Sequence, residues 1–181
     1  MIFTRQLALS ALILLIASTG SLAQERLQTY LLATDAILDR ANSSLNSFVS
    51  EATALKQERD VVALKASSDK QIRTWNAILT ELKEINPPEE ASKHFASLRS
   101  LILFQQENNE ILSSTLGSQL KLVQELQDMK NQGLTAKELE LHAQENALDH
   151  ELLEKRLQDI RKGVHKSQEA LSTERQRLNS F

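Results

Sequence analysis

Apolar residues recur along this chain at alternating intervals of four and three, and the first such run extends from Leu27 to Leu55. This spacing places the apolar side chains on one stripe of a helix for four heptads, as in a coiled coil. Tyr30 and Ile37 widen the stripe toward the broader apolar face that a multi-helix bundle needs. The pattern therefore predicts a helix over residues 25–57.

The apolar pattern changes phase after the first helix and resumes over residues 60–85, although no glycine or proline marks the change. We favour a turn at 58–60, with Asp60 as the N-cap of a second helix. One alternative is a break at 66–69, where a capping box could form. The other is a single continuous helix with a stutter in its heptads.

Pro87 and Pro88, the only prolines of the chain, separate the second helix from a third over residues 88–130. A proline disfavours the α conformation in the residue before it, which ends the second helix. Pro88 can then occupy the first position of the third helix, where its missing N–H is not needed. Glu89 and Glu90 follow, and their negative charges favour a helix N-terminus.

The apolar stripe of the third helix is interrupted at residues 105–110, which are all polar. Gln105 and either Asn108 or Asn109 would continue the stripe through this gap. A buried amide at such a position fixes the register of packed helices and lowers their stability. Alternatively, the helix leaves the bundle here and its middle is solvated. The sequence leaves both interpretations open.

A fourth helix is predicted over residues 135–179, after a turn at Gly133. Gly133 can take the left-handed conformation that ends a helix, and Thr135 with Glu138 forms a potential capping box. Apolar positions then alternate by fours and threes as far as Leu178, with polar residues at some of them. Two helices of about 42 residues would each extend about 63 Å, which exceeds what a compact bundle of this mass requires.

These patterns predict an all-α protein, an antiparallel helical bundle of about four long helices with an extended, coiled-coil-like C-terminal hairpin. In this arrangement residues 24–130 form the bundle, and the helix over 135–179 pairs back on the helix over 88–130. Composition agrees, because four glycines and two prolines are too few turn formers for many strands. The abundant Leu, Ala, Glu, Gln and Lys residues favour helix.

Residues 1–23 have the three-part layout of a secretory signal peptide. Arg5 precedes an apolar run over residues 7–17, and small residues lead to a cleavage site between Ala23 and Gln24. The apolar run is shorter than the roughly 20 residues that span a bilayer, although an uncleaved membrane anchor is the alternative. We expect an exported protein, periplasmic or extracellular in a bacterium, with no stable membrane span after cleavage.

The charge balance argues against nucleic acid as a partner. Removing residues 1–23 removes Arg5 and no acidic residue, so the remaining chain carries a formal charge of 20 − 24 = −4. Nucleic acids and anionic lipids both call for a concentrated basic face. The basic residues between Lys155 and Lys166 alternate with acidic ones, which is typical of a solvated helix face. The chain has no cysteine, so disulfides and a lipid-modified cysteine are excluded.

No residue pattern predicts a catalytic, cofactor-binding or metal site. Di-metal helical bundles use Glu-x-x-His repeats, and none occurs around His94, His142, His150 or His165. We interpret the four histidines as surface or packing residues, and expect His94 to pack near the two prolines. Nucleophile elbows and glycine-rich phosphate loops are also missing from the sequence. We therefore expect neither an enzyme nor a cofactor.

Trp75, the only tryptophan, lies on an apolar helix face and is expected to anchor the core. Together with Leu79, Leu82, Pro87-Pro88 and His94 it resembles a recurring pattern in small exported bacterial helical proteins and lipoproteins of unassigned function. The resemblance covers residues 72–103 and implies an exported bundle with a structural helix corner formed by Pro87, Pro88, Trp75 and His94. It implies no activity. The chain departs from the pattern by lacking the lipoprotein cysteine and by its long final hairpin.

The function expected from the sequence is that of an exported, non-enzymatic interaction or structural protein that acts through coiled-coil-like surfaces. Its partner would be another protein or a second copy of the chain. One alternative is a periplasmic chaperone of the holdase type, which would grip unfolded clients with its helical arms. A second alternative is a helical bundle that binds a small ligand or a metal.

Overall fold

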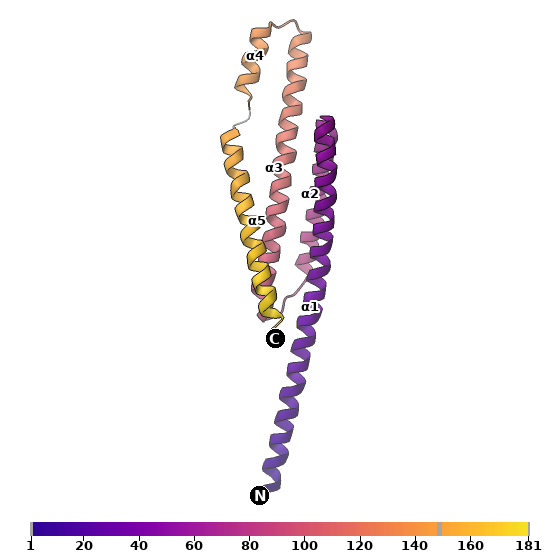
Figure 1. Cartoon of the computed structure of the whole chain (residues 1–181), viewed down its shortest axis with the longest axis vertical. Helices are drawn as coiled ribbons and strands as arrows, with labels where there is room; N and C mark the ends of the chain where they lie inside the picture. Colours follow the sequence, from indigo (N-terminus) through magenta and orange to yellow (C-terminus); the bar gives the residue numbers. More distant parts are fainter. Residues whose placement is uncertain (1, 148–149, 181) are drawn as a thin grey trace.

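The computed structural model describes the backbone of residues 2–147 and 150–180, and side chains from Leu22 onward except that of His150. Most of the predicted signal segment therefore lies outside the described side chains. Within the described residues the chain forms five α-helices, one 3₁₀ turn and no strand, so the all-α prediction is confirmed (Figure 1). Successive long helices run in opposite directions.

The first two helices, α1 (Ile2–Glu58) and α2 (Val61–Glu84), are joined by a tight turn. Arg59 takes a positive φ of 59°, and the side chain of Asp60 accepts a hydrogen bond from the N–H of Ala63. Asp60 is therefore the N-cap of α2, as the favoured interpretation predicts. The alternative break at 66–69 is wrong, because those residues lie inside α2.

The diproline corner (residues 85–91) connects α2 to α3 (Ser92–Asn131) through the 3₁₀ turn η1 (Glu89–Ala91). Pro88 has a ψ of 154° and is the N-cap of η1, so the prediction that it occupies the first helical position is wrong. An extended Pro88 lets the chain change direction before the helical hydrogen bonds begin. The α-helix then starts only at Ser92.

The stretch 135–179, predicted as one helix, is two helices, α4 (Ala136–Glu145) and α5 (His150–Leu178). The predicted capping box between Thr135 and Glu138 is present, and Gly133 has the expected positive φ of 86°. Helix α4 ends at Asn146, its C-cap residue. The side-chain amide of Asn146 donates to the backbone carbonyl of His142, 2.9 Å away. Asn146 and His150 fall on the regular spacing although they are polar. The spacing therefore continues across the break, where no apolar side chain at these positions would hold a helix against a neighbour.

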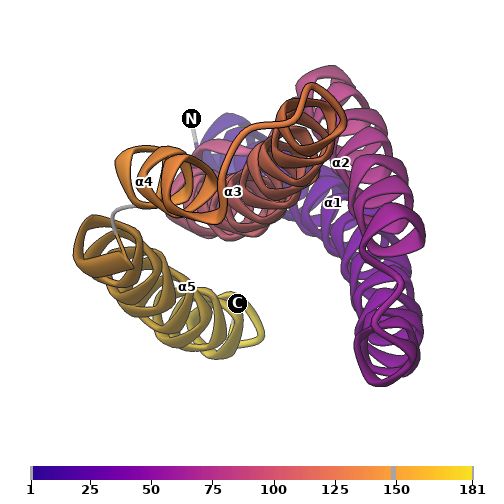
Figure 2. The same cartoon turned by 90° about the horizontal axis from the view of Figure 1, so that it is seen from above.

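Helices α1, α2, α3 and α5 share one set of buried apolar side chains, which we call the four-helix core. Its buried members are Ile37, Ala41, Trp75, Ile78, Leu82, Leu98, Leu101, Ile102 and Leu171. Seen from above, α3 lies between the α1–α2 pair on one flank and α4 with α5 on the other (Figure 2). The core residues belong to the part of α3 nearest the diproline corner.

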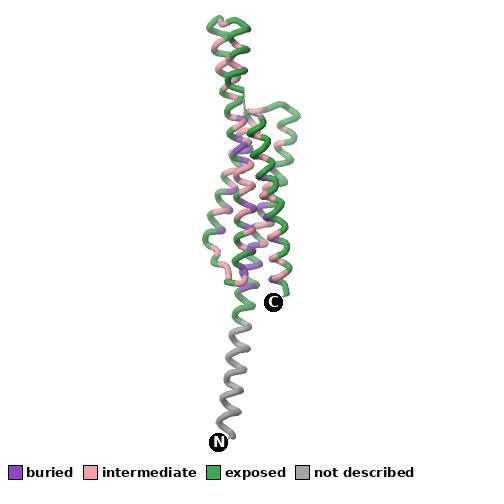
Figure 3. Tube along the Cα trace, turned by 90° about the vertical axis from the view of Figure 1, so that its left-hand side faces the viewer, coloured by how far each residue is buried: buried purple, intermediate pink, exposed green. Residues whose placement is uncertain are grey.

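The far end of the molecule is packed differently. Figure 3 shows the buried positions along the middle of the molecule, whereas the hairpin of α3 and α4 is half-buried or exposed throughout. We call residues 117–145 the hairpin arm. It extends beyond the α1–α2 turn (Figure 1) and consists of the end of α3, a turn, and α4.

Candidate functional site

The diproline corner is held by a buried contact between α1 and α3. The hydroxyl of Tyr30 lies 2.8 Å from Nδ1 of His94, and the two rings meet edge to face with centroids 5.7 Å apart. Burial raises the pKa of Tyr30 and lowers that of His94, since it disfavours the charged form of each. The pair is therefore neutral near pH 7, and its buried hydrogen bond joins α1 to α3.

Two arginines of α5 close the same end of the molecule. Arg175 binds Asp35 of α1 at 2.6 Å, and Arg177 donates to the backbone carbonyl of Glu90 in η1. Leu178 packs beneath them against Leu27, Tyr30, Leu31 and Ala91. The corner thus joins α1, η1, α3 and α5 through both apolar and charged contacts.

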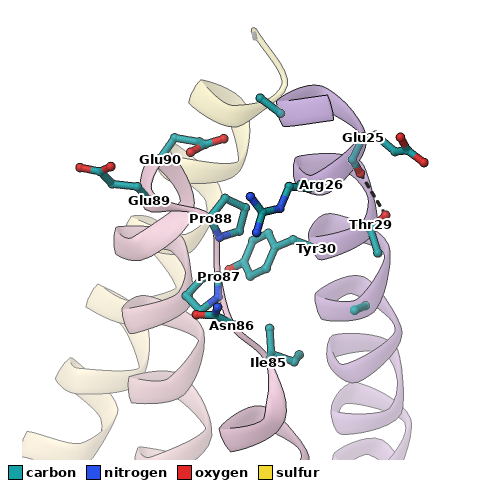
Figure 4. Close-up of a pocket in the computed structure, with 12 residues that line it drawn as sticks. Glu25, Arg26, Thr29, Tyr30, Ile85, Asn86, Pro87, Pro88, Glu89 and Glu90 are labelled. Atoms are coloured by element: carbon teal, nitrogen blue, oxygen red, sulfur yellow. Dashed lines mark hydrogen bonds between the residues drawn. The ribbon is translucent and has the colours of Figure 1, made fainter. Parts of the chain in front are cut away.

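A pocket of about 660 Å³ opens beside this corner, between α1 and residues 85–90. Figure 4 shows Arg26 and Tyr30 of α1 directed toward Pro87 and Pro88, which form the opposite wall. Glu89 and Glu90 also line the pocket, and the carboxylate of Glu89 points away from α1 (Figure 4). The pocket therefore combines the apolar wall of Pro87 and Pro88 with Arg26 and with the acidic residues Glu25, Glu89 and Glu90.

Trp75 is not part of the corner, although the sequence pattern grouped it there. It is 1% exposed and its indole N–H donates to the side-chain oxygen of Asn109, 2.9 Å away. Ser68 donates to the backbone carbonyl of Asn109 at 3.0 Å. Asn109 lies 15 residues beyond His94 on α3, about 22 Å along the helix. The two contacts are therefore separate.

The burial of Asn109 decides between the two interpretations of the polar stretch at residues 105–110. Asn109 is 1% exposed, so the interpretation with a buried amide is correct and the solvated one is wrong at this position. Among the described residues, the side-chain nitrogen atoms of Asn109 and Gln71 have no hydrogen-bond partner. Trp75 and Ser68 therefore account for the bonds that hold Asn109 in register between α2 and α3.

Asp69, Ser113 and Lys65 form a cluster of an acidic, a hydroxyl and a basic side chain between α2 and α3. Asp69 binds Lys65 at 2.7 Å and accepts from the hydroxyl of Ser113. The Lys65 ammonium and the Ser113 hydroxyl hold the pKa of Asp69 below its ordinary value. These contacts keep Asp69 in its anionic form, in which it holds the Lys65 ammonium and the Ser113 hydroxyl. The cluster links α2 to α3.

The remaining histidines lie apart from one another. His142 approaches Glu125 of α3 at 3.3 Å, and the exposed His165 approaches Glu169 at the same distance. The side chain of His150 lies outside the described residues. In the part of the chain that the structure describes, no group of three or more potential metal ligands occurs.

The hairpin arm has no buried residue between positions 117 and 145, all of which the structure describes. Its two helices cover each other only in part. Val123 of α3 remains 61% exposed and Leu141 of α4 remains 56% exposed. Other large apolar residues of the arm are half-buried: Leu120, Leu122, Leu126, Met129, Leu134 and Leu139. The arm therefore presents apolar side chains outside the four-helix core.

Polar contacts fix the shape of the arm. Glu125 lies between Lys121, 3.4 Å away in the same helix, and His142 of α4, and these two neighbours lower its pKa. The capping box between Thr135 and Glu138 orders the start of α4. Since the arm has little apolar burial, these contacts and the helix propensity of its residues contribute much of its order.

A groove of about 560 Å³ lies between α3 and α5, just below the arm; we call it the α3–α5 groove. Ile111 and Leu153 give it an apolar floor, and Glu110 and Arg156 stand at its rim. Arg156 also binds Glu107 at 3.3 Å.

Sequence reasoning did not single out the arm residues Val123 and Leu141 or the groove residue Ile111 as a candidate site. In the sequence, Val123 falls on the regular apolar spacing of the third helix. Its exposure follows from the length of α3, which continues past the α1–α2 turn. The excess length of the predicted hairpin was the available signal.

Comparison with known proteins gives no assignment: the chain matches no family model, no curated protein and no solved structure. Within the described residues, no helix is both long and apolar enough to cross a membrane. The predicted cleavage site between Ala23 and Gln24 lies on an exposed part of α1, and Ala23 also lines the corner pocket.

Proposed function

We propose that this chain is an exported, non-enzymatic interaction protein whose contact surface is the hairpin arm. The observation that carries the proposal is the exposure of Val123 and Leu141 on a hairpin in which no residue is buried. Apolar side chains that a segment does not bury by itself are available to a partner, and protein-protein interaction sites gather such side chains. The corner and the four-helix core serve as the scaffold that holds the arm.

The Tyr30–His94 pair at the corner and the Asp69 cluster between α2 and α3 both favour a structural role over catalysis. Tyr30 and His94 are neutral partners, and Asp69 is held as an anion by its neighbours. A helix that offers apolar side chains to a partner helix, in contrast, needs only packing and a matching charge pattern.

Photo-crosslinking in the producing cell tests the proposal. A photoreactive amino acid in place of Leu141 or Val123 is expected to give covalent adducts with a protein, because a partner would cover these positions. The same substitution at Leu32, which is 71% exposed on α1 outside the arm, is the matched control and should give far fewer adducts. Equal labelling at all three positions, or none at the arm, would contradict the proposal.

The second candidate function is a chaperone of the holdase type, and the projecting apolar arm is also the feature that favours it. Unfolded clients would be held by Val123 and Leu141 without a fixed register. Aggregation of a reduced or chemically unfolded model protein should then be suppressed at several-fold excess of the chain. Loss of that suppression in Leu141→Glu, with Leu32→Glu unaffected, would favour the chaperone over a specific partner.

A further inference from the structure

The last turn of α5, residues 174–178, is fastened to two other elements, and we call it the C-terminal latch. Arg175 binds Asp35 of α1 at 2.6 Å. Arg177 donates to the backbone carbonyl of Glu90 in η1. The two arginines therefore tie the end of α5 both to α1 and to the diproline corner.

His94, near the start of α3, lies beside this latch and is 1% exposed. Its hydrogen-bond partner is the hydroxyl of Tyr30 in α1. The charged groups that act on it come from both flanking helices: Asp35 from α1, and Glu174 and Arg175 from α5. A proton on His94 would therefore add a buried positive charge close to that of Arg175.

The two carboxylates that could balance this charge are already bound to arginines. Asp35 binds Arg175, and Glu174 binds Arg177 at 2.8 Å. The Nη1 atom of Arg175 is buried and has no hydrogen-bond partner among the described residues, so the bond to Asp35 is not backed by another at that atom. An imidazolium that attracts Asp35 would weaken this bond, and a partly buried charge that loses its partner is unfavourable.

We infer that the latch is acid-sensitive: protonation of His94 detaches the last turn of α5 from α1 and η1 while the four-helix core stays folded. The inference goes beyond the proposed function and does not depend on the hairpin arm. Histidine is the side chain that ordinarily changes its charge between pH 5 and 8.

The pKa of His94 supports this direction of change. In the closed latch, burial and the charge of Arg175 lower it, whereas Asp35 and Glu174 raise it, and the net effect is a lower pKa. Opening the latch separates Arg175 from His94 and admits water, so the open form binds the proton more tightly. The closed form is therefore favoured above the ordinary pKa of histidine, and acid shifts the population toward the open form.

Opening the latch uncovers apolar surface at the corner. Leu178 is 2% exposed and packs in a cluster with Leu27, Leu31 and Ala91. Leu171, two turns earlier in α5, belongs to the four-helix core and keeps the rest of the helix in place. The change is therefore confined to the last turn of α5 and to the surface that Leu178 covers.

Hydrogen–deuterium exchange followed by mass spectrometry tests the latch in protein made from the full-length chain and purified as the cell processes it. Each rate is divided by that of an unstructured peptide at the same pH, which gives a protection factor free of the intrinsic effect of pH. Protection of the amides of residues 174–179 should fall at least about fivefold between pH 7.5 and pH 5. At both pH values it should stay far below that of residues 98–102, because the latch opens without unfolding the core.

Two pairs of variants identify the groups responsible. His94→Gln cannot take up the proton and should remove the pH dependence, whereas His165→Gln, at an exposed position, should keep it. Asp35→Asn weakens the bond to Arg175 at every pH, so latch protection should already be low at pH 7.5. Asp39→Asn, exposed on the same helix, is its matched control and should leave the protection unchanged.

Constant latch protection down to pH 5, an undiminished pH dependence in His94→Gln, or full protection of the latch in Asp35→Asn would each overturn the inference. Equal protection of latch and core amides would also overturn it, because the latch would then open only when the whole chain unfolds. None of these results bears on photo-adducts at Leu141, which test the proposed function separately.

Discussion

The two ends of α3 have the same kind of sequence, with regular apolar spacing and charged residues between, yet they are packed in opposite ways. At the corner end, Leu98 is fully buried and His94 is hydrogen-bonded to Tyr30. At the arm end, Leu126 is only half-buried and Val123 is mostly exposed. The difference is in the number of neighbouring helices, since α1, α2 and α5 surround one end and α4 alone covers the other.

This contrast indicates that the two ends of α3 contribute differently to the stability of the fold. Helix stability in proteins comes mainly from packing an apolar face, so the corner end is expected to hold the fold. The arm has a comparable apolar face that the chain does not cover by itself. Regions with little apolar burial open with small free energies, which is common for segments that bind partners.

The largest expected effect is the difference between core and arm truncations. Leu98→Ala should lower the free energy of unfolding by about 2–5 kcal/mol, because it leaves a cavity among fully buried neighbours. Leu141→Ala should change it by less than about 0.5 kcal/mol, since the side chain is mostly exposed. Urea unfolding followed by circular dichroism measures both. Similar losses at the two positions would refute the division between the ends.

A smaller effect is expected where α3 passes from the core toward the arm. Asn109→Ala removes the acceptor of the buried Trp75 N–H, which should destabilise the chain by about 1–3 kcal/mol. Asn42→Ala, at an exposed position of α1, is the control and should change stability by less than about 0.5 kcal/mol. In Trp75→Phe the donor is already gone, so Asn109→Ala should have less effect there. A purely additive double-mutant cycle would contradict the role of this bond.

Stability should fall as the pH decreases through the ordinary range of histidine. Burial lowers the pKa of His94, an effect that the nearby Arg175 increases, while Asp35 and Glu174 oppose it. The unfolded chain therefore binds a proton near pH 6.5, before the folded chain does. The contribution of neutral His94 is complete above that pH and is lost below it, at up to about 1.4 kcal/mol per pH unit.

Equilibrium unfolding between pH 5 and 8 measures this dependence. His94→Gln should flatten the slope, whereas His165→Gln, at an exposed position, should leave it unchanged. Tyr30 also faces His94 but stays neutral across this range, because burial raises its pKa. The carboxylates with lowered pKa, such as Asp69, titrate at lower pH. An identical slope in His94→Gln would show that another group is responsible.

The smallest expected effect comes from two glycines of opposite environment. A Cβ at Gly163 would lie 2.5 Å from the ring of Phe104, so Gly163→Ala requires α3 and α5 to adjust. A Cβ at Gly117 would meet only the flexible end of Lys65, at 3.3 Å. We expect Gly163→Ala to destabilise by about 1 kcal/mol, with the clash exceeding the gain in helix propensity. Gly117→Ala should stabilise by up to about 1 kcal/mol. Thermal unfolding of both variants tests the difference in sign.

Local signals in the sequence predicted most of the helix boundaries. Asp60 caps α2, Gly133 ends α3, and Thr135 with Glu138 begins α4, because each of these features depends only on residues within one turn. The break at Asn146 was missed because heptad spacing counts positions and does not measure burial. A regular pattern can therefore continue across a helix end.

Contacts between distant residues could not be predicted in the same way. Tyr30 and His94 are 64 residues apart and Trp75 and Asn109 are 34 apart, so their pairing depends on how the helices are arranged. The sequence allowed either a buried or a solvated amide at residues 105–110, and the packing of α2 against α3 decides between them. The arm was foreseen only as an excess of helix length, and its exposed residues required the structure.

Helix α3 is a single rod of 40 residues, about 60 Å long, that belongs to both ends of the molecule. Three other helices pack around its N-terminal part. The packing there therefore sets the direction in which its C-terminal end points. The residues at the tip therefore have a fixed distance from the core and a fixed direction around the helix axis. Each residue inserted into or removed from the rod would turn the tip by about 100° and move it by about 1.5 Å.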